Sequence, residues 1–413
     1  MKKISLLLLL CMLIAVSAPV LSGCKSEGDT TTLYVYNWGE YIADGSDGTM
    51  NVNAEFEKYC KETLGLNVKV NYSTFSSNES MYSKISSGSA AYDVIVPSDY
   101  MIQRMVAEDL LAPLDLSKIP NYQYIDEKFK GDNVYYEDDS DNVYSIPYFY
   151  GMIGIIYNSD IVAHEDVADE SWELMWNPNY TRDILQFNNS RDAFGTAMYA
   201  LQYDVNHATE DQWRDALAKL KDQKELVQGY VMDEIFNKMK SGSAAVAAYY
   251  AGDYFAMYDD NDSLSFYYPK EGTNSYIDAM CIPANSKNFD LASEYINFMC
   301  REDVAVANAE YTYYASPLST VAENSEYQEY MQKVHPDAMD ILYGEKARSV
   351  PTQAYLNLTP DNLVLLNDLW EELKIESSIG TGIYVCCGII VGALVLLGVG
   401  AAVKKRRRAK YYD

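Results

Sequence analysis

The sequence predicts an α/β fold of two lobes, placed between an N-terminal signal segment and a C-terminal apolar helix. Three observations support this prediction. About 350 residues lie between the two end segments, which is more than one core usually organises. Strand-like and helix-like segments alternate along this stretch, as they do in sheets covered by helices on both faces. The long uncharged apolar segments stand at the two ends of the chain.

Residues 1–24 have the pattern of a bacterial lipoprotein signal. Lys2 and Lys3 make a positive start, and residues 6–16 are mostly apolar. The segment ends in Leu-Ser-Gly-Cys, which is similar to the lipobox of bacterial lipoproteins. That similarity implies cleavage before Cys24 and lipidation of Cys24. A plain secretory signal is the alternative.

The C-terminal end carries a second apolar segment. Residues 383–403 contain no charged side chain and are long enough to span a bilayer. Basic residues follow directly, so the positive-inside rule places the tail, residues 404–413, in the cytoplasm. We therefore expect a transmembrane helix at 383–403. The body of the protein would lie outside the cell or in the periplasm, attached to the membrane at both ends.

Acidic residues dominate the chain between its two ends. The whole chain has a formal net charge of −28. Without the charged residues of the signal and the tail, 24 basic residues stand against 59 acidic residues, a net charge of −35. Such a charge makes nucleic acid a poor partner, because phosphates would be repelled, and it makes a cation a good one. The alternative is that the acidic residues only keep the protein soluble.

Cysteine is too sparse for a disulfide framework or a zinc site. The body contains Cys60, Cys281 and Cys300, and no two of them have CxxC spacing. A bridge between Cys281 and Cys300 is one alternative. Buried free thiols are the other, and we favour them.

The first part of the body alternates between strands and helices. Residues 33–38 are β-branched and aromatic, as strands are, and residues 51–65 have apolar side chains at helical spacing with a terminal glycine. The alternation predicts a mainly parallel sheet covered on both faces. The other elements expected here are strands at 67–75 and 92–97 and helices at 79–87 and 99–110.

A second α/β region follows. Residues 144–158 are rich in strand formers, and residues 244–250 predict a further buried strand. The remaining expected elements are a strand at 278–283 and helices at 190–203, 211–223, 291–299, 303–311 and 361–374.

Three short segments place an aromatic ring beside a carboxylate. They are NWGEY (37–41), YAGDY (250–254) and YID (276–278), and more than 200 residues separate the first from the other two. Carboxylates bind ammonium groups by charge-assisted hydrogen bonds, while rings cover methylenes and attract cations. The pattern predicts a pocket for a slender cation that has methylenes between its charges.

Five longer segments of the body are distinctive. They are LYVYNWGEYI, STFSSNESMYSKI, YDVIVPSDYM, YSIPYFYGMIGIIYN and YPKEG…YIDAMCIPANSKN. In these segments the chain closely resembles the spermidine/putrescine-binding proteins of polyamine ABC transporters. The resemblance covers roughly residues 33–375.

This resemblance implies a two-lobed periplasmic-binding-protein-like fold of type II, which closes on its ligand. The chain should cross between the lobes near residues 151–154, 276–278 and 314–320. These crossings divide the body into two parts. Lobe 1 would hold residues 25–152 and 278–318, and lobe 2 would hold residues 153–277 and 319–376.

The resemblance also implies residues that contact the polyamine. Trp38 and Tyr41 match the family's N-W-x-E-Y segment, and Glu40 stands where putrescine binders place an acid. Ser98 and Tyr100 match a Pro-Ser-x-Tyr turn of the family.

In the second half of the chain, two tyrosines replace two tryptophans of the family. Tyr250 stands at the position of one ring and Tyr276 at the position of the other. Asp253 is an acid typical of putrescine binders, and Asp278 matches the acid that holds an amine.

One position departs from the family. Its D-x-x-E pair, which holds a terminal amine of spermidine, is represented here by Asn189 and Asp192, so one of two charges is missing. The family's last polar ligand, a Gln, is expected somewhere in residues 348–357. These residues favour a diamine, while putrescine and spermidine both stay open.

Some of these residues have structural alternatives. Trp38 has a core position as its alternative, and Asp192 has an ion pair with Arg191. Either Ser98 or Asp99 should cap the helix that starts there. We expect Ser98 to contact the ligand and Asp99 to cap the helix or support the site.

We expect a receptor that captures putrescine or spermidine and delivers it to an ABC permease and its ATPase. It should need no cofactor or metal, and no GxSxG, HExxH or P-loop motif points to an enzyme. Ferric ion held by the pairs Tyr249-Tyr250 and Tyr313-Tyr314, or another small cation, is the alternative. A membrane-anchored polyamine sensor is a further alternative.

Overall fold

The computed structural model describes residues 30–131 and 142–378. The expected lipoprotein signal with Cys24, the expected transmembrane helix at 383–403 and the basic tail all lie outside these ranges. Within the described ranges, no helix is both long enough and apolar enough to cross a membrane.

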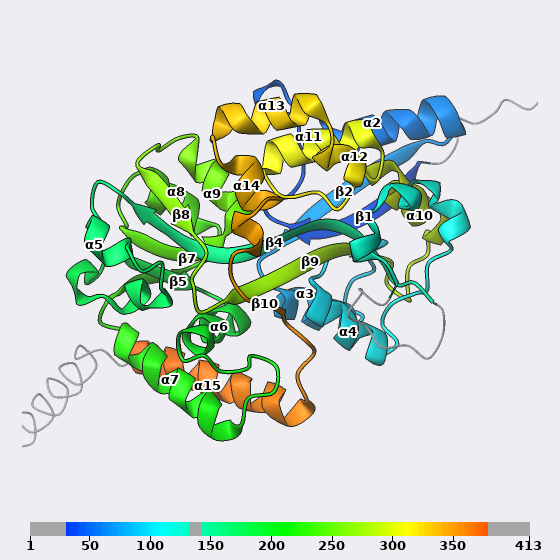
Figure 1. The fold of residues 1–413 in the computed structure, drawn as a ribbon. Helices are drawn as coiled ribbons and strands as arrows, with labels where there is room; N and C mark the ends of the chain where they lie inside the picture. The colour runs from blue at the N-terminus through cyan, green and yellow to red at the C-terminus, as the bar shows by residue number, and fades with distance from the viewer. Residues whose placement is uncertain (1–29, 132–141, 379–413) are drawn as a thin grey trace, which may run out of the picture.

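A continuous path of paired strands runs through the molecule. Its order is β2-β1-β3-β9-β4-β7-β5-β6, with β10 beside β9 and β8 beside β4 (Figure 1). The strands are β1 (Thr31–Trp38), β2 (Val68–Phe75), β3 (Val94–Ile95), β4 (Ser145–Asn158), β5 (Ile184–Phe187), β6 (Val227–Val231), β7 (Val246–Tyr250), β8 (Leu264–Tyr267), β9 (Thr273–Cys281) and β10 (Thr352–Ala354).

The long strand β4 joins the two halves of the molecule. Its first part, through Met152, pairs with β9, and its second part, from Ile153, pairs with β7 and then β8. We call the side with β1, β2 and β3 the first lobe and the side with β5 to β8 the second lobe. In Figure 1 the two long strands β4 and β9 lie side by side where the lobes meet.

The sheet is mixed, whereas the alternation of elements predicted a mainly parallel one. β1 is parallel to β2 and β3, and β5 is parallel to β6 and β7. The strands β4 and β9 instead pair antiparallel with each other, β9 with β3, and β4 with β7 and β8. The reason is that β4 takes the chain out of the first lobe and β9 brings it back.

The first lobe has its helices against β1, β2 and β9. α2 begins at Asn51, whose side chain accepts a hydrogen bond from Ala54 N. The expected helix at 51–65 ends in a π-helical turn, η2, and stops at Gly65, where φ is 68°. The helices of this part are η1 (Ser46–Gly48), α2 (Val52–Tyr59), η2 (Cys60–Leu64), α3 (Asn78–Ser86), α4 (Asp99–Ala107), η3 (Leu116–Lys118), η4 (Pro120–Tyr124), η5 (Glu127–Phe129), α10 (Phe289–Met299) and α11 (Glu302–Thr312).

The second lobe surrounds β5, β6 and β7 with helices. α7 starts with a capping box in which Thr209 and Gln212 satisfy each other's backbone N–H. The helices of this part are α5 (His164–Val167), η7 (Trp172–Trp176), η8 (Pro178–Tyr180), α6 (Ser190–Ala200), α7 (Glu210–Gln223), α8 (Glu234–Lys240) and α9 (Ala251–Tyr258).

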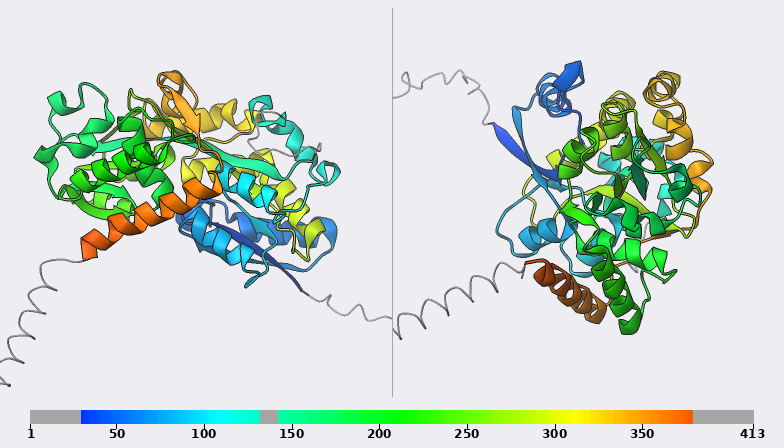
Figure 2. Two further views of the ribbon diagram at one scale, coloured as in Figure 1. Left: turned by 90° about the horizontal axis from the view of Figure 1, so that it is seen from below. Right: turned by 90° about the vertical axis from the view of Figure 1, so that its left-hand side faces the viewer.

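The last part of the described chain returns to the second lobe. β10 pairs with β9, and α15 then packs along α7 and α6 (Figure 2). The helices of this part are α12 (Ser319–Ala322), α13 (Ser325–Val334), α14 (Ala338–Leu342), η9 (Lys346–Arg348) and α15 (Pro360–Ser378).

Two hydrophobic cores form, and the cysteines divide between them. A smaller core under α3 and α4 includes Cys281, and the main core includes Cys60 and Cys300. All three are buried free thiols. The alternative of a bridge between Cys281 and Cys300 is therefore wrong, and the expectation of free thiols is confirmed.

Candidate functional site

A pocket with about 810 Å³ of empty space, part of which is open to solvent, lies between the two lobes. Its walls come from the turn after β1, from α3, α4 and β9, and from the starts of α6, α8 and α9. The eleven residues that the sequence assigns to a polyamine site all line it, although their contact with a ligand stays a prediction. They are Trp38, Glu40, Tyr41, Ser98, Tyr100, Asn189, Asp192, Tyr250, Asp253, Tyr276 and Asp278.

Strand ends and helix starts bring these side chains together. Trp38 and Tyr250 are the last residues of β1 and β7. Ser98 and Asn189 come directly before α4 and α6. The carboxyl ends of strands in α/β sheets form a crevice of this kind. Trp38 is partly exposed in that crevice, so it is not simply a core ring.

Glu40 adopts a left-handed backbone conformation, with φ at 50°. This conformation costs a residue with a side chain about 1–2 kcal/mol. It lets the chain turn sharply after Gly39, so that Tyr41 is buried in the wall of the pocket, 4% exposed. Strained residues of this kind gather at ligand sites.

Asp278 is held by two hydroxyl groups from the first lobe. Tyr41 Oη donates to Oδ2 at 2.7 Å and Ser98 Oγ donates to Oδ1 at 2.6 Å. Burial raises the pKa of Asp278 to about 6, while the two hydrogen bonds act in the opposite direction. The Ser98 hydroxyl is thereby committed to Asp278 and does not cap α4.

Asp253 stands at the start of α9 in the second lobe. Tyr314 Oη donates to its Oδ2 at 2.8 Å. Burial, together with the smaller effect of the negative charges of Asp233 and Glu40, raises the pKa of Asp253 to about 8. These three acids therefore form one group in the pocket.

Asp192 lies in the first turn of α6. Tyr250 Oη and Asn189 Nδ2 both donate to its Oδ2, at 2.7 and 2.8 Å. Burial raises the pKa of Asp192, and the charge of Glu79 adds to the rise. Asn189 also caps α6 by accepting from Asp192 N. The side chain of Asn189 thus positions Asp192 while it lines the pocket.

Asp99 lines the pocket and also supports it. Its Oδ1 accepts from Tyr100 N at 2.7 Å and its Oδ2 accepts from Ile277 N at 3.2 Å, so it ties α4 to β9. Burial raises the pKa of Asp99 to about 8. The supporting role expected for this residue agrees with its contacts.

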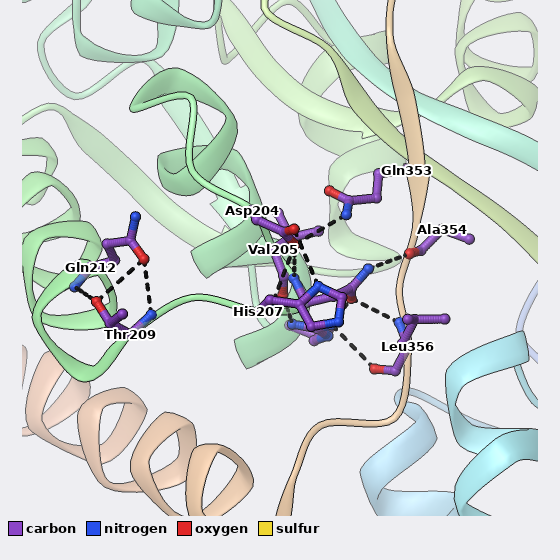
Figure 3. Close-up of polar contacts among 10 residues, drawn as sticks. Asp204, Val205, His207, Thr209, Gln212, Gln353, Ala354 and Leu356 are labelled. Carbon is purple, nitrogen blue, oxygen red and sulfur yellow. Dashed lines mark hydrogen bonds and ion pairs between the residues drawn. The ribbon is translucent and has the colours of Figure 1, made fainter.

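The stretch 348–357 contributes a ring where a Gln was expected. Gln353 is turned away, because its Nε2 donates to Asp204 Oδ1 at 3.1 Å (Figure 3). The neighbouring segment is fixed by Asn206, which donates to Ala354 O and accepts from Leu356 N. Tyr355 lines the pocket instead.

Among the residues that the structure describes, no Lys, Arg or His lines the pocket. Arg191 follows the cap of α6, but its guanidinium donates to Val205 O and Asn206 Oδ1, each at 2.9 Å, and stacks on the Tyr355 ring. The alternative of a structural Arg191–Asp192 ion pair is therefore wrong, because Asp192 is bonded to hydroxyl and amide groups. The pocket keeps its negative charge for a ligand.

Several pocket residues escaped the sequence reading. Asn78 and Glu79 lie in the segment STFSSNESMYSKI, which carried the resemblance but suggested no ligand role. Tyr314 belonged to a tyrosine pair that was considered as an iron ligand. No local sequence pattern suggested a ligand role for Asp233 or Tyr355. The missed polar and aromatic residues considered below are Asn78, Glu79, Asp233, Asn274, Tyr314 and Tyr355.

Comparison with known proteins gives consistent relatives. A model of the bacterial extracellular solute-binding protein family matches residues 54–334. The spermidine/putrescine-binding periplasmic protein of Escherichia coli K12 is 33% identical over 325 residues, which are 77% of this chain and 86% of that protein. The putrescine-binding periplasmic protein of the same strain is 29% identical and covers 69% of this chain and 77% of its own length.

Solved structures agree. A protein from Listeria monocytogenes matches with a TM-score of 0.73 and 34% identity, over 84% of this chain and 99% of that chain. The spermidine/putrescine ABC transporter substrate-binding protein of Streptococcus pneumoniae matches with a TM-score of 0.63 and 31% identity, with the same coverage. The chain belongs to the bacterial extracellular solute-binding proteins, in the family of the spermidine/putrescine-binding periplasmic proteins.

Proposed function

We propose that this protein captures a polyamine outside the cytoplasm and delivers it to the permease of an ABC transporter with its ATPase. One observation carries the proposal. Seven carboxylates line one pocket without a basic side chain from residues 30–131 and 142–378, and four of them accept a hydrogen bond from a tyrosine hydroxyl. Relatives with spermidine and putrescine in their names support the same ligand class.

The chemistry suits an alkyl polyamine. Charge-assisted hydrogen bonds hold the ammonium groups, while the rings of Trp38, Tyr250 and Tyr276 cover the methylenes. The Tyr250 and Tyr276 rings already meet edge to face, with centroids 5.3 Å apart. Closing the lobes removes water and strengthens each of these contacts. The permease recognises the closed form. No bond is made or broken, so the protein needs no cofactor and is not an enzyme.

Ferric ion is the weaker candidate. Of the tyrosines that suggested it, Tyr250 and Tyr314 donate their hydroxyl protons to carboxylates. Among residues 30–131 and 142–378, no group of three His, Cys, Asp or Glu side chains could hold a metal. A membrane-anchored sensor uses the same pocket, and deletion of the permease gene separates it from a transport receptor.

We further propose the boundaries and anchors that the sequence suggests. Lobe 1 holds residues 25–152 and 278–318, and lobe 2 holds residues 153–277 and 319–376, in a type II arrangement supported by the strand order β2-β1-β3-β9-β4. Lipidated Cys24 and a transmembrane helix at 383–403 fix the body to the outer face of the cell membrane. Mass spectrometry of the membrane-extracted protein tests the lipid on Cys24.

Isothermal titration calorimetry of the full chain in detergent tests the ligand class. We expect putrescine and spermidine to bind with dissociation constants in the micromolar range or below, and ferric ion not to bind. Absence of polyamine binding below about millimolar concentration would refute the proposal.

A further inference from the structure

Two carboxylates from opposite lobes line the pocket, close enough for the charge of Glu79 to raise the pKa of Asp192. Glu79 lies in the first turn of α3, in the first lobe, and Asp192 lies in the first turn of α6, in the second. Tyr100 connects them. Its hydroxyl donates to Glu79 Oε1 at 2.9 Å, and the charges of Glu79 and Asp192 both raise the pKa of Tyr100, after the larger effect of burial.

Each of these carboxylates keeps one oxygen for a ligand. Asp192 uses Oδ2 for the hydrogen bonds from Tyr250 and Asn189. Glu79 uses Oε1 for the hydrogen bond from Tyr100. Oδ1 of Asp192 and Oε2 of Glu79 accept no hydrogen bond from the described residues. An ammonium group placed between them would bridge the two lobes and relieve the repulsion of the two charges.

A buried amide gives a second, independent sign of a ligand. Asn274, Tyr276 and Asp278 occupy alternate positions of β9, so their side chains face the same pocket. Asn274 is 3% exposed, and its Oδ1 has no hydrogen-bond partner among the described residues. An unpaired buried acceptor costs about 1–3 kcal/mol, so this oxygen calls for an N–H from outside the protein.

We propose that Glu79 supplies the second carboxylate of the amine site that Asp192 begins, and that the pocket is thereby built for a triamine of the spermidine type. This inference rests on the proposed polyamine function. It names a residue on the opposite lobe that replaces the charge missing at Asn189. The pocket then holds acids in three places, at Asp192 with Glu79, at Asp278, and at Asp253 with its neighbours.

A diamine has two ammonium groups and leaves one of these places empty. A triamine fills all three and also offers further N–H groups to Asn274 Oδ1. Glu79 therefore discriminates between the two ligands. Its removal should weaken spermidine more than putrescine, because only the longer ligand reaches every acid at once.

Calorimetry of the full chain in detergent tests the role of Glu79. We compare wild type and Glu79→Gln with spermidine and with putrescine. Glu79→Gln should lower the affinity for spermidine by at least about tenfold more than it lowers the affinity for putrescine. Glu55→Gln is the matched control, because Glu55 also lies in the first turn of a first-lobe helix but is outside the pocket. Neither affinity should change in the control.

A new carboxylate on the second lobe should restore the spermidine affinity of Glu79→Gln. In Glu79→Gln, the second change Asn189→Asp places a carboxylate next to Asp192 while its oxygen still caps α6. Spermidine affinity should return to within about threefold of wild type. A residue with a merely structural role would not be rescued in this way.

The outcomes separate this inference from the proposed function. If wild type binds polyamines and Glu79→Gln weakens both ligands equally or neither, the role of Glu79 is overturned and the function stands. If wild type binds neither polyamine, the function fails and this inference fails with it. Thermal unfolding of each variant checks the fold, and an unfolding temperature close to wild type makes the affinities comparable.

Discussion

At the scale of single residues, four of the acids that line the pocket are each paired with a phenol. A hydroxyl donor fixes the direction of a carboxylate without cancelling its charge, as Lys or Arg would. The charge therefore remains available for a cation. The pairs are Tyr41 with Asp278, Tyr314 with Asp253, Tyr250 with Asp192 and Tyr100 with Glu79.

Asp278→Asn should weaken polyamine binding by about tenfold or more. The amide keeps the shape and can still meet Ser98 and Tyr41, but it loses the charge that holds an ammonium, which is worth about 1.5–3 kcal/mol. Calorimetry measures the affinity. Asp262→Asn, at an exposed position of the second lobe, serves as control and should change nothing. A loss of less than about threefold would show that Asp278 is not an amine partner.

The residues of the site could be predicted from the sequence only where they belong to a short local motif. Trp38, Glu40 and Tyr41 adjoin one another, and Asp253 and Asp278 stand beside rings, so sequence was enough to select them. Glu79 and Tyr355 reach the pocket only because α3 and the segment after β10 fold against it. Nothing local separates such residues from solvated surface positions.

At the scale of elements, close backbone contact sets the position of a pocket ring. Gly252, in the first turn of α9, lies against Tyr314. A Cβ at position 252 would stand 2.5 Å from Cδ2 of the Tyr314 ring, which is too close for any ordinary contact. The glycine thus allows Tyr314 to reach Asp253.

Gly252→Ala should therefore displace Tyr314 and break its hydrogen bond to Asp253. We expect a loss of about 1–3 kcal/mol in the free energy of unfolding from overpacking, together with weaker polyamine binding. Chemical denaturation and calorimetry measure the two effects. Gly229→Ala is the control, since a Cβ there would meet only Val231, at 3.9 Å. Wild-type affinity in Gly252→Ala would contradict this account.

Elements were predicted best where their pattern was long. The strands at β1, β2 and β4 and the helices α3, α7 and α10 agree with expectation to within a few residues. The short strands β5, β6, β8 and β10 were missed, because segments of three to five residues are too short for periodicity to distinguish a strand from a helix or a loop. β9 starts at Thr273 and not at 278. Its first residues are polar and did not suggest a strand, although Thr273 and Asn274 are buried in the structure.

At the scale of the whole molecule, ionisation of the buried carboxyl groups of the site lowers the stability of the ligand-free protein. Burial raises the pKa of Asp99 and of Asp253 to about 8, from 3.8 for the ordinary group. Between these values the folded state binds more protons than the unfolded state. The free energy of unfolding therefore falls as pH rises from about 4 to about 8.

The ligand-free full chain should unfold at a lower temperature at pH 8 than at pH 5. Asp253→Asn removes one of the buried ionisations, so it should raise the unfolding temperature relative to wild type, and by more at pH 8 than at pH 5. Calorimetric scans measure both, with Asp262→Asn as control. An unfolding temperature for Asp253→Asn that tracks wild type at both pH values would show that Asp253 does not govern this dependence.

The two ends of the described chain belong to different lobes. β1 starts in the first lobe, and α15 ends on the helices of the second (Figure 2). The distance between these two ends therefore reports how one lobe moves relative to the other. Donor and acceptor dyes on unnatural amino acids at the exposed positions Thr31 and Glu371 would report lobe rotation as a change in energy transfer, one molecule at a time. Spermidine at a concentration near the wild-type dissociation constant should shift that signal in wild type and shift it much less in Asp278→Asn.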